Sequence, residues 1–369
     1  MPNGPLSRPS GPTDPPVGAH PGAGLNPDPH PIGEGERAKR GGGAKSPNWL
    51  SIQHLRGLAA LSVVLFHACQ WSQINFATGQ AGVDLFFVIS GFVMWTSTAG
   101  GAGRPLEFLK RRLIRVAPLY WVITLALAAG VLLVPARFPD LAVTPGHLLL
   151  SMAFVQHMNP AGYPFPLLAP GWTLNYEAVF YLVFAALLWL PEARRMFALT
   201  LALIVMAFAG FAWPPAYQML LNPLFLEFLA GVWLARMAQT SLLPDRSLGW
   251  LLVGAGLGLF TMIQLINMDW DLWRPMVWGA PAVMLVAGAV SIEADGGWPA
   301  IPGLKTLGDA SYSIYLIHTL TVGALAITIG AWNPPIFIPL AMIVAIASGL
   351  ACWRWLEQPM LNALRRRLA

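Results

Sequence analysis

Long apolar runs dominate this chain, and the first of them occupies residues 50–70, LSIQHLRGLAALSVVLFHACQ. A bilayer core about 30 Å thick takes about 20 helical residues, and this run has that length with few charged side chains. A surface helix would instead show an apolar stripe along one face only. The run therefore predicts a transmembrane helix.

Nine further segments follow the same pattern, and the connections between several of them are short. The segment at 146–158 is apolar but short, and it fits an interfacial or re-entrant piece better than a span. We therefore predict an all-α integral membrane protein, a bundle of about ten transmembrane helices. The predicted spans are residues 50–70, 82–99, 116–134, 173–190, 196–213, 218–237, 248–267, 275–292, 309–330 and 334–355.

The composition excludes several other classes of protein. Of the 369 residues, 56% are hydrophobic and 11% are charged, whereas soluble domains carry roughly 25% charged residues. This argues against an ordinary cytosolic enzyme, a disulfide-rich secreted scaffold and a fibrous protein. The net charge of +5 indicates no nucleic-acid binding, because the basic residues lie between apolar segments. Cys69 and Cys352 lie in or beside such segments, so we expect no disulfide.

Residues 1–47 differ from the rest of the chain. They hold 11 of the 33 prolines and 10 of the 36 glycines, a composition that buries too little apolar surface to order itself. They also lack the apolar core of a signal peptide. We predict a disordered cytoplasmic tail here, with a binding tail as the alternative, followed by a membrane domain over residues 48–369.

Lysine and arginine counts predict the orientation of the bundle. With the N-terminus in the cytoplasm, 20 of the 22 basic residues fall on the inner side, and only Arg137 and Arg274 fall outside. Cytoplasmic loops carry such an excess of basic residues. An even number of spans then places both termini inside.

Two polar side chains share one face of the first span. Arg56 and His67 are eleven residues apart, which brings them within about 20° of each other around the helix and separates them by about 16 Å along it. Ionisable groups at membrane depth are costly and commonly functional; the alternative is a snorkelling arginine and a hydrogen-bonded core histidine. Asp84 enters the second span at about the depth of His67, where it could orient the imidazole or cap its own helix.

Further ionisable groups lie along the chain. Lys110, Arg111, Arg112 and Arg115 cluster before the third span, as either a phosphate clamp or an ordinary positive-inside feature. Glu177 lies one turn into the fourth span, where a carboxylate needs a partner or a water-filled cavity. Glu227 and His318 are at mid-membrane positions and could form a further polar site or be satisfied packing groups. No spacing typical of a metal site or a phosphate-binding glycine loop is present.

Six blocks containing polar or glycine residues follow one another along the chain. They are Arg56-x10-His67, GVDLFFVISG (82–91), RRLIRVAP (111–118), WTLNYE (172–177), SYSIYLIH (311–318) and EQP (357–359). Taken in this order, the blocks resemble those of the acyltransferase family 3 membrane proteins, and the resemblance covers about residues 50 to 367. The GWTLNYE block most resembles the branch that acylates bacterial exopolysaccharides of the succinoglycan type. Gln358 departs from the basic residue common in the last block.

This resemblance implies an enzyme of the bacterial inner membrane that transfers an acyl group, usually acetyl from acetyl-CoA, to a sugar hydroxyl of a surface or lipid-linked glycan. It implies that Arg56 and His67 are the essential pair, and that Arg112 and Arg115, with Arg111 beside them, lie at the donor site. Acyl-CoA would be a cosubstrate, with no bound cofactor or metal. The polysaccharide and the lipid bilayer would be the other partners.

The chemistry fits those residue types. An imidazole of near-neutral pKa is a suitable general base for a sugar hydroxyl, so we expect His67 to be the base, with Glu177 or Asp84 orienting it and Arg56 holding a donor phosphate. Direct transfer and an acyl-enzyme relay both stay open. The alternatives are the same chemistry on lipopolysaccharide, peptidoglycan, a small lipid or an antibiotic, and, in another class, a glycan transporter.

Overall fold

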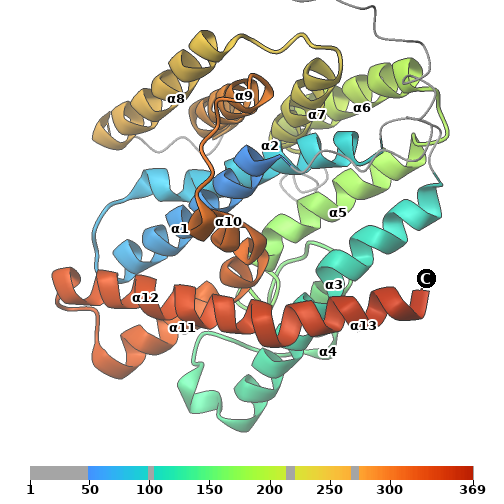
Figure 1. Ribbon diagram of the computed structural model, residues 1–369. Helices are drawn as coiled ribbons and strands as arrows, with labels where there is room; N and C mark the ends of the chain where they lie inside the picture. The colour runs from blue at the N-terminus through green and yellow to red at the C-terminus, as the bar shows by residue number, and fades with distance from the viewer. Residues whose placement is uncertain (1–48, 99–103, 213–220, 267–273, 369) are drawn as a thin grey trace, which may run out of the picture. The chain divides into compact units, whose positions relative to one another are not determined.

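The computed structural model describes residues 49–98, 104–212, 221–266 and 274–368. Every regular element in these ranges is helical (Figure 1). The tail predicted over residues 1–47 lies outside them, as do the ends of the spans predicted at 82–99, 196–213, 218–237 and 248–267.

Most of the connections between the described helices are short, and the one between α4 and α5 covers residues 153–170. Two elements, η6 and η7, are π-helical turns that continue directly into α9 and α13. The elements are α1 (Leu50–Trp71), η2 (Ala77–Gln80), α2 (Ala81–Thr96), α3 (Pro105–Leu133), η3 (Pro135–Arg137), α4 (Pro145–Met152), α5 (Gly171–Ala186), α6 (Glu192–Ala212), α7 (Phe225–Gln239), α8 (Arg246–Ile266), η6 (Pro275–Gly279), α9 (Ala280–Ala294), α10 (Pro302–Asp309), α11 (Ser311–Ile329), α12 (Pro334–Cys352), η7 (Trp353–Glu357) and α13 (Gln358–Leu368).

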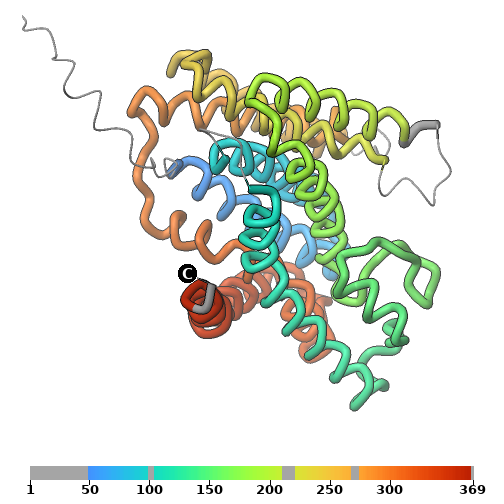
Figure 2. Tube along the Cα trace, turned by 90° about the vertical axis from the view of Figure 1, so that its right-hand side faces the viewer, coloured from blue at the N-terminus to red at the C-terminus, as the bar shows by residue number. Residues whose placement is uncertain are grey.

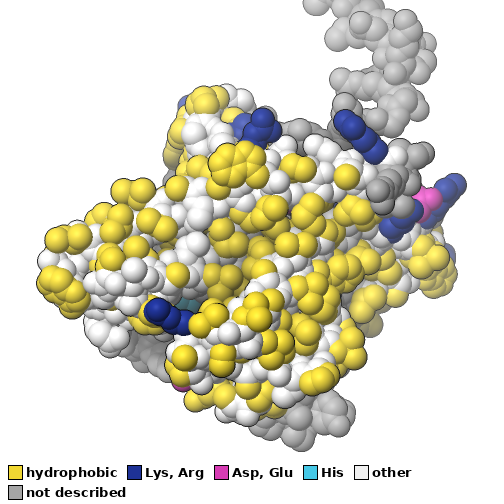
Figure 3. Space-filling model, turned by 90° about the horizontal axis from the view of Figure 1, so that it is seen from below, with side chains coloured by type: hydrophobic (Ala, Val, Ile, Leu, Met, Phe, Trp, Pro, Cys, Tyr) yellow, Lys and Arg dark blue, Asp and Glu magenta, His cyan; other side chains and the backbone are white. Residues whose placement is uncertain are grey.

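Seven helices within the described ranges are long and apolar enough to cross a membrane. This agrees with an integral membrane protein, while the count of ten spans and the inside placement of both termini stay predictions. The face drawn in Figure 3 carries mostly hydrophobic side chains and few charged ones. The seven candidates are Leu50–Trp71, Ala77–Thr96, Pro105–Leu133, Arg246–Ile266, Pro275–Ala294, Ser311–Ile329 and Pro334–Arg366.

The three other predicted spans differ from these for identifiable reasons. Helix α5 has 16 residues and α7 has 15, so each is shorter than a bilayer core requires. The apolar run predicted as 173–190 continues past Ala186, where α5 ends, because hydropathy does not mark the turn that precedes α6. Helix α6 has 21 residues but begins with charged side chains at Glu192, Arg194 and Arg195.

Helix α3 begins earlier than the span predicted at 116–134. It starts at Pro105, a residue suited to the first helical position, and pairs between Glu107 and the side chains of Arg104 and Arg111 support its first turns. The basic cluster is therefore helical. Its members point in different directions around α3, and they do not form one loop.

Helices α2 and α7 approach each other closely because each has a glycine at the crossing. A Cβ built on Gly91 would lie 2.0 Å from the Phe228 carbonyl oxygen, and one on Gly231 would lie 1.9 Å from that of Val88. Small residues allow such backbone contact between membrane helices. The rings of Phe87, Phe180 and Phe228 stack beside this crossing, so α2, α5 and α7 share one core.

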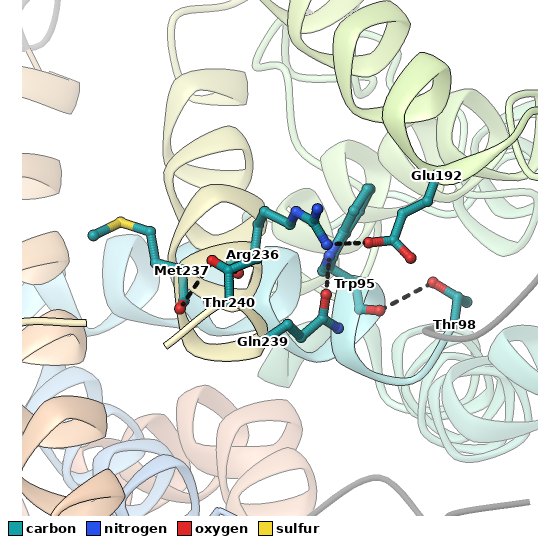
Figure 4. Close-up of polar contacts among 7 residues, drawn as sticks. All are labelled: Trp95, Thr98, Glu192, Arg236, Met237, Gln239 and Thr240. Atoms are coloured by element: carbon teal, nitrogen blue, oxygen red, sulfur yellow. Dashed lines mark hydrogen bonds and ion pairs between the residues drawn. The ribbon is translucent and has the colours of Figure 1, made fainter. Parts of the chain in front are cut away.

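Polar contacts fix one end of this core (Figure 4). The Trp95 indole of α2 donates to Gln239 of α7 (2.9 Å), and Arg236 of α7 pairs with Glu192 of α6. On the other side of α2, the Glu293 carboxylate of α9 accepts from the backbone N–H groups of Leu50 and Ser51 (both 2.7 Å). A carboxylate at a helix N-terminus is favourable, so α1 begins at a defined point.

The C-terminal helices complete the arrangement around α1 and α3. Helices α11 and α12 pack on α1, and α13 lies against α3 (Figures 1 and 2). Residues from the first and last fifths of the membrane domain are thereby brought together, and this placement positions the site.

Candidate active site

One cavity of about 150 Å³ lies among α1, α2, α3, α5 and α11. It joins four residues that the sequence singled out on three separate helices, together with hydroxyl groups from α2, α5 and α11. Its polar lining consists of Arg56, Arg112, Arg115, Glu177, Ser90, Thr173, Tyr181, Ser311, Tyr312 and Tyr315.

The three arginines of the cavity differ in their partners. Arg115 pairs with Glu357, which is 2% exposed and also accepts from the Ser313 hydroxyl (2.6 Å). Arg112 donates to the Ser97 hydroxyl (3.3 Å) and lies over the Phe108 ring. Arg56, within the described part of the chain, forms no hydrogen bond or ion pair. Its guanidinium is therefore available to an anion that enters the cavity.

Glu177 is held in the cavity wall by two hydroxyl groups. Ser90 of α2 donates to its Oε1 (3.0 Å), and Tyr181, one turn further along α5, donates to the same atom. Two carboxylates, Glu177 and Glu357, thus face three guanidiniums, and the cavity keeps a net positive charge. Arg112, Glu177 and Tyr181 also border a second, apolar cavity of about 270 Å³ between α3 and α5.

His67 and His318 form a pair between α1 and α11. Their ring centroids are 5.0 Å apart at an interplanar angle of 43°. His67 Nδ1 lies 3.2 Å from the Gln70 side-chain oxygen, and His318 Nδ1 lies 2.5 Å from the Tyr315 carbonyl oxygen. The Tyr315 carbonyl oxygen can only accept, so His318 carries its proton on Nδ1 and keeps a lone pair on Nε2.

The imidazole pair lies one aromatic layer from the cavity. Tyr315 lines the cavity, and its ring centroid is 5.6 Å from that of His318 and 5.7 Å from that of Phe86. The Tyr315 hydroxyl donates to the Pro170 carbonyl (3.2 Å) and lies 3.1 Å from the Thr173 hydroxyl. The ring of Tyr315 therefore connects the lining of the cavity with the imidazole pair.

Asp84 has a different partner from the one expected. Its carboxylate is fully buried and receives two hydrogen bonds from Arg274, Nε to Oδ1 (3.0 Å) and Nη2 to Oδ2 (2.7 Å). Among the described residues no hydrogen bond joins Asp84 or Glu177 to His67, so the orienting contact expected from one of these carboxylates is absent there. Asp84 pairs with Arg274, a bidentate partner that an imidazole cannot match. Glu177 accepts from the hydroxyl groups of Ser90 and Tyr181.

The remaining predicted residues lie apart from the cavity. Glu227 of α7 is 2% exposed and lies beside Asp84 and Gly279, away from His318. Arg111 is exposed on α3 next to Glu107 and does not line the cavity. Within the described ranges, no three His, Cys, Asp or Glu side chains gather as a metal site would require.

The sequence did not indicate two contacts at or beside the cavity, Arg115 with Glu357 and His67 with His318. Glu357 belongs to the EQP block, and its partnership with Arg115 depends on α12 and η7 returning to α3. The pairing of His67 with His318 depends likewise on α1 lying against α11. The pairing of Arg115 with Glu357 could have been inferred from the sequence, because an arginine at membrane depth needs a carboxylate partner.

Two known proteins are similar to this chain over most of its length. The exopolysaccharide production protein ExoZ of Rhizobium meliloti (strain 1021) is 37% identical over 319 residues, which cover 82% of this chain and 96% of that protein. A Komagataeibacter xylinus protein, BcsY, whose name describes it as a membrane-bound transacylase, is 30% identical over 290 residues, 72% of this chain and 71% of that protein. No solved structure matches the chain significantly.

A family model also matches most of the chain. The match covers residues 49–354 and therefore includes the cavity and the imidazole pair, while Glu357 lies just beyond it. The model describes an acyltransferase domain. The chain therefore belongs to acyltransferase family 3 and is an acyltransferase, as its six sequence blocks predicted.

Proposed function

We propose that this protein moves an acyl group, acetyl in the first instance, from cytoplasmic acyl-CoA to a sugar hydroxyl of an exopolysaccharide or of its lipid-linked precursor, in the bacterial inner membrane. Family membership supports the acyl transfer, and the name of the Rhizobium meliloti relative supports the class of acceptor. The observation that carries the proposal is a cavity lined by three arginines, one aromatic ring away from a pair of imidazoles.

The donor's phosphates are the natural partners of the cavity's cations. Guanidinium groups bind phosphate through paired hydrogen bonds. Arg115 is engaged in an ion pair with Glu357, whereas Arg56 and Arg112 still have N–H groups that can donate to a phosphate. Glu357 holds the Arg115 guanidinium in place, and the two carboxylates Glu177 and Glu357 together do not cancel the charge of the three guanidiniums. Arg111, on the surface of the same helix, attracts the donor to the mouth of the site at longer range.

His67 is the proposed general base. Its Nε2 lone pair takes the proton of the sugar hydroxyl as the oxygen attacks the thioester carbonyl. The carbon–sulfur bond then breaks, and the proton passes from His67 to the departing CoA sulfur, so that one ester and one thiol leave the site. The same base also serves a relay in which an acyl-enzyme forms first.

The first test uses the host's own polysaccharide. The gene is deleted and restored as wild type, as His67→Ala or as His54→Asn, and O-acyl signals on the purified surface polysaccharide are compared by proton NMR. His54 is a matched control, because it lies on the same helix but contacts Trp298 outside the cavity. We expect the signals to return with wild type and His54→Asn only. Unchanged signals in the deletion strain would refute this acceptor class.

A second test isolates the chemistry. Purified protein in detergent, given acetyl-CoA and the deacylated glycan, should release free thiol, and His67→Ala should lower that rate by about 10²- to 10⁴-fold, the usual contribution of a general base. Full activity of His67→Ala would remove His67 from the mechanism. Glycan movement without thiol release would point to a transporter.

A further inference from the structure

The carboxylate of Glu177 has one oxygen that the proposed reaction does not use. Its Oε1 accepts from the hydroxyl groups of Ser90 (3.0 Å) and Tyr181, whereas its Oε2 receives no hydrogen bond from the described residues. Within those residues Glu177 also forms no ion pair with an arginine, although three arginines line the same cavity. An ionised group at membrane depth is costly. An open oxygen there indicates a partner that arrives with a ligand.

The cavity is long in the direction of helix α2. Its lining residues on α2 recur at helical spacing along one face, from Val83 to Met94, and eleven helical residues rise about 16 Å. Tyr315 lies toward the Val83 end, since its ring contacts that of Phe86 with a centroid separation of 5.7 Å. This is also the end nearer to the imidazole pair, because the Tyr315 ring packs beside His318.

Glu177 lies between the two ends of this cavity. Arg112 marks the Met94 end, because it donates to the hydroxyl of Ser97, just past Met94 on α2 (3.3 Å). Ser90, which holds Glu177, is one turn of α2 before Met94 and two turns after Val83. A ligand that reaches from Arg112 to the imidazole pair therefore passes the open oxygen of Glu177.

The charge of Glu177 determines which part of the donor can lie beside it. A carboxylate repels phosphate and accepts hydrogen bonds from N–H groups. The donor's phosphates belong with the guanidiniums, so the part that passes Glu177 must be neutral and must carry an N–H. The arm of coenzyme A meets both conditions, because secondary amides lie between its phosphates and its sulfur.

A serine hydroxyl in the cavity wall is also without a partner. Ser311 of α11 borders the cavity, its side chain is 0% exposed, and its Oγ forms no hydrogen bond in the described part of the chain. A buried hydroxyl in that state is costly. An amide needs one acceptor for its N–H and one donor for its carbonyl oxygen, and Glu177 and Ser311 are an unused acceptor and an unused donor.

We infer that Glu177 and Ser311 form a binding site for the amide groups of the donor's arm. Glu177 Oε2 accepts an amide N–H, and the Ser311 hydroxyl donates to an amide carbonyl oxygen. The two residues thereby select acyl donors that carry this arm, while the guanidiniums bind the phosphates. This inference rests on the proposed function and assigns a specificity to the same cavity.

The test compares two ligands, one with the arm and one without it. Purified protein in detergent is titrated calorimetrically with CoA and with adenosine 3′-phosphate 5′-diphosphate, the nucleotide part of CoA. Glu177→Gln keeps an oxygen for Ser90 and Tyr181 and puts an NH₂ group in the place of Oε2, where it cannot accept. We expect this change to raise the Kd for CoA by about 10- to 100-fold, the worth of a hydrogen bond to a charged group, without weakening the nucleotide.

Three further variants complete the comparison. Ser311→Ala removes a single oxygen and tests the site even if Glu177→Gln does not fold; it should weaken CoA alone, by about 2- to 10-fold. Arg56→Met should weaken both ligands by a similar factor, because both carry the phosphates. Glu192→Gln is the matched control, since it makes the same change at a carboxylate that pairs with Arg236 outside the cavity, and it should leave both Kd values unchanged.

The two proposals fail in different ways. A wild-type protein that binds neither ligand would contradict the proposed function. Tight CoA binding that Glu177→Gln leaves unchanged, or weakens equally with nucleotide binding, would keep that function and overturn the role of Glu177 in binding the arm. An unchanged Kd for CoA in Ser311→Ala would overturn the role of Ser311.

Discussion

The ion pair between Arg115 and Glu357 offers a test of how the cavity is held together. Its two members are buried unequally, since the Arg115 side chain is 27% exposed, on the cavity side, and that of Glu357 is 2% exposed. Ser313 donates to the second oxygen of Glu357. Replacing one member should therefore have a different effect from replacing the other.

The magnitudes follow from what each substitution leaves behind. Arg115→Met leaves a carboxylate buried with only a hydroxyl donor, and breaking such a pair costs about 3 to 5 kcal/mol. Glu357→Gln leaves a guanidinium that faces the cavity and can be hydrated there, and the amide still accepts from Ser313. Its cost should be nearer the worth of one charged hydrogen bond, about 1.5 to 3 kcal/mol. The double variant leaves no uncompensated charge and should be more stable than Arg115→Met alone.

The assay is thermal unfolding in detergent, followed by intrinsic tryptophan fluorescence at one fixed heating rate, because membrane proteins commonly unfold irreversibly. We expect Arg115→Met to have the lowest midpoint, Glu357→Gln an intermediate one, and the double variant a midpoint at or above that of Glu357→Gln. Equal midpoints for the two single variants, or a double variant less stable than both, would refute the reasoning from unequal burial.

Three further outcomes can be checked with the same assay. Gly231→Ala should prevent folding or lower the midpoint sharply, because its Cβ would lie 1.9 Å from a backbone oxygen, whereas Gly254→Ala, with nothing within 4 Å of its Cβ, should be neutral or stabilising by up to about 1 kcal/mol; similar midpoints would contradict the close crossing of α2 and α7. Glu293→Gln should cost about 1 kcal/mol and expose the start of α1 to proteolysis, since it removes a charged cap from two N–H groups; unchanged cleavage would argue against the cap. Burial, and secondarily the neighbouring His157, holds the pKa of His147 in α4 below its ordinary value. The unfolded chain therefore binds the proton more readily than the folded one, and stability should fall as the pH drops below about 6.5. His147→Gln should reduce this dependence of stability on pH.

Local patterns in the sequence predicted the helices better than the partners. The span carrying Arg56 and His67 is confirmed as a membrane-length helix, because hydropathy and helical period are properties of one segment. Helix ends were less accurate: the apolar residues after Ala186 form turns, and Pro105 starts α3 well before the apolar run begins. Hydropathy does not distinguish a helical apolar residue from one in a buried turn.

Pairing between distant segments was the harder part of the site. Asp84 was expected near His67 only because both lie at about the same depth in the membrane. That depth does not determine the direction in which Asp84 points around α2. Arg274, which lies 190 positions after Asp84 in the sequence, pairs with that carboxylate instead. Glu177, Arg112 and Arg115 do reach one cavity with Arg56, because α3 packs on α5 and α11, α5 also contacts α2, and α1 packs on both α2 and α11. The charge of an ionisable side chain and its depth in the membrane can be inferred from the sequence. Its partner can be identified only once the packing of the helices is known.

The spacing of Arg56 and His67 on one helix also limits the form of the donor. Eleven helical residues rise about 16 Å, and the ring of Tyr315 stands between the cavity and the imidazole pair. A molecule whose phosphates are held at Arg56 can present its acyl carbon to His67 only through a long, slender arm. Coenzyme A has such an arm, whereas an acyl phosphate carries its anionic group beside the reactive carbonyl. With His67 as the proposed base, this spacing therefore favours a thioester of coenzyme A over a compact activated acyl group.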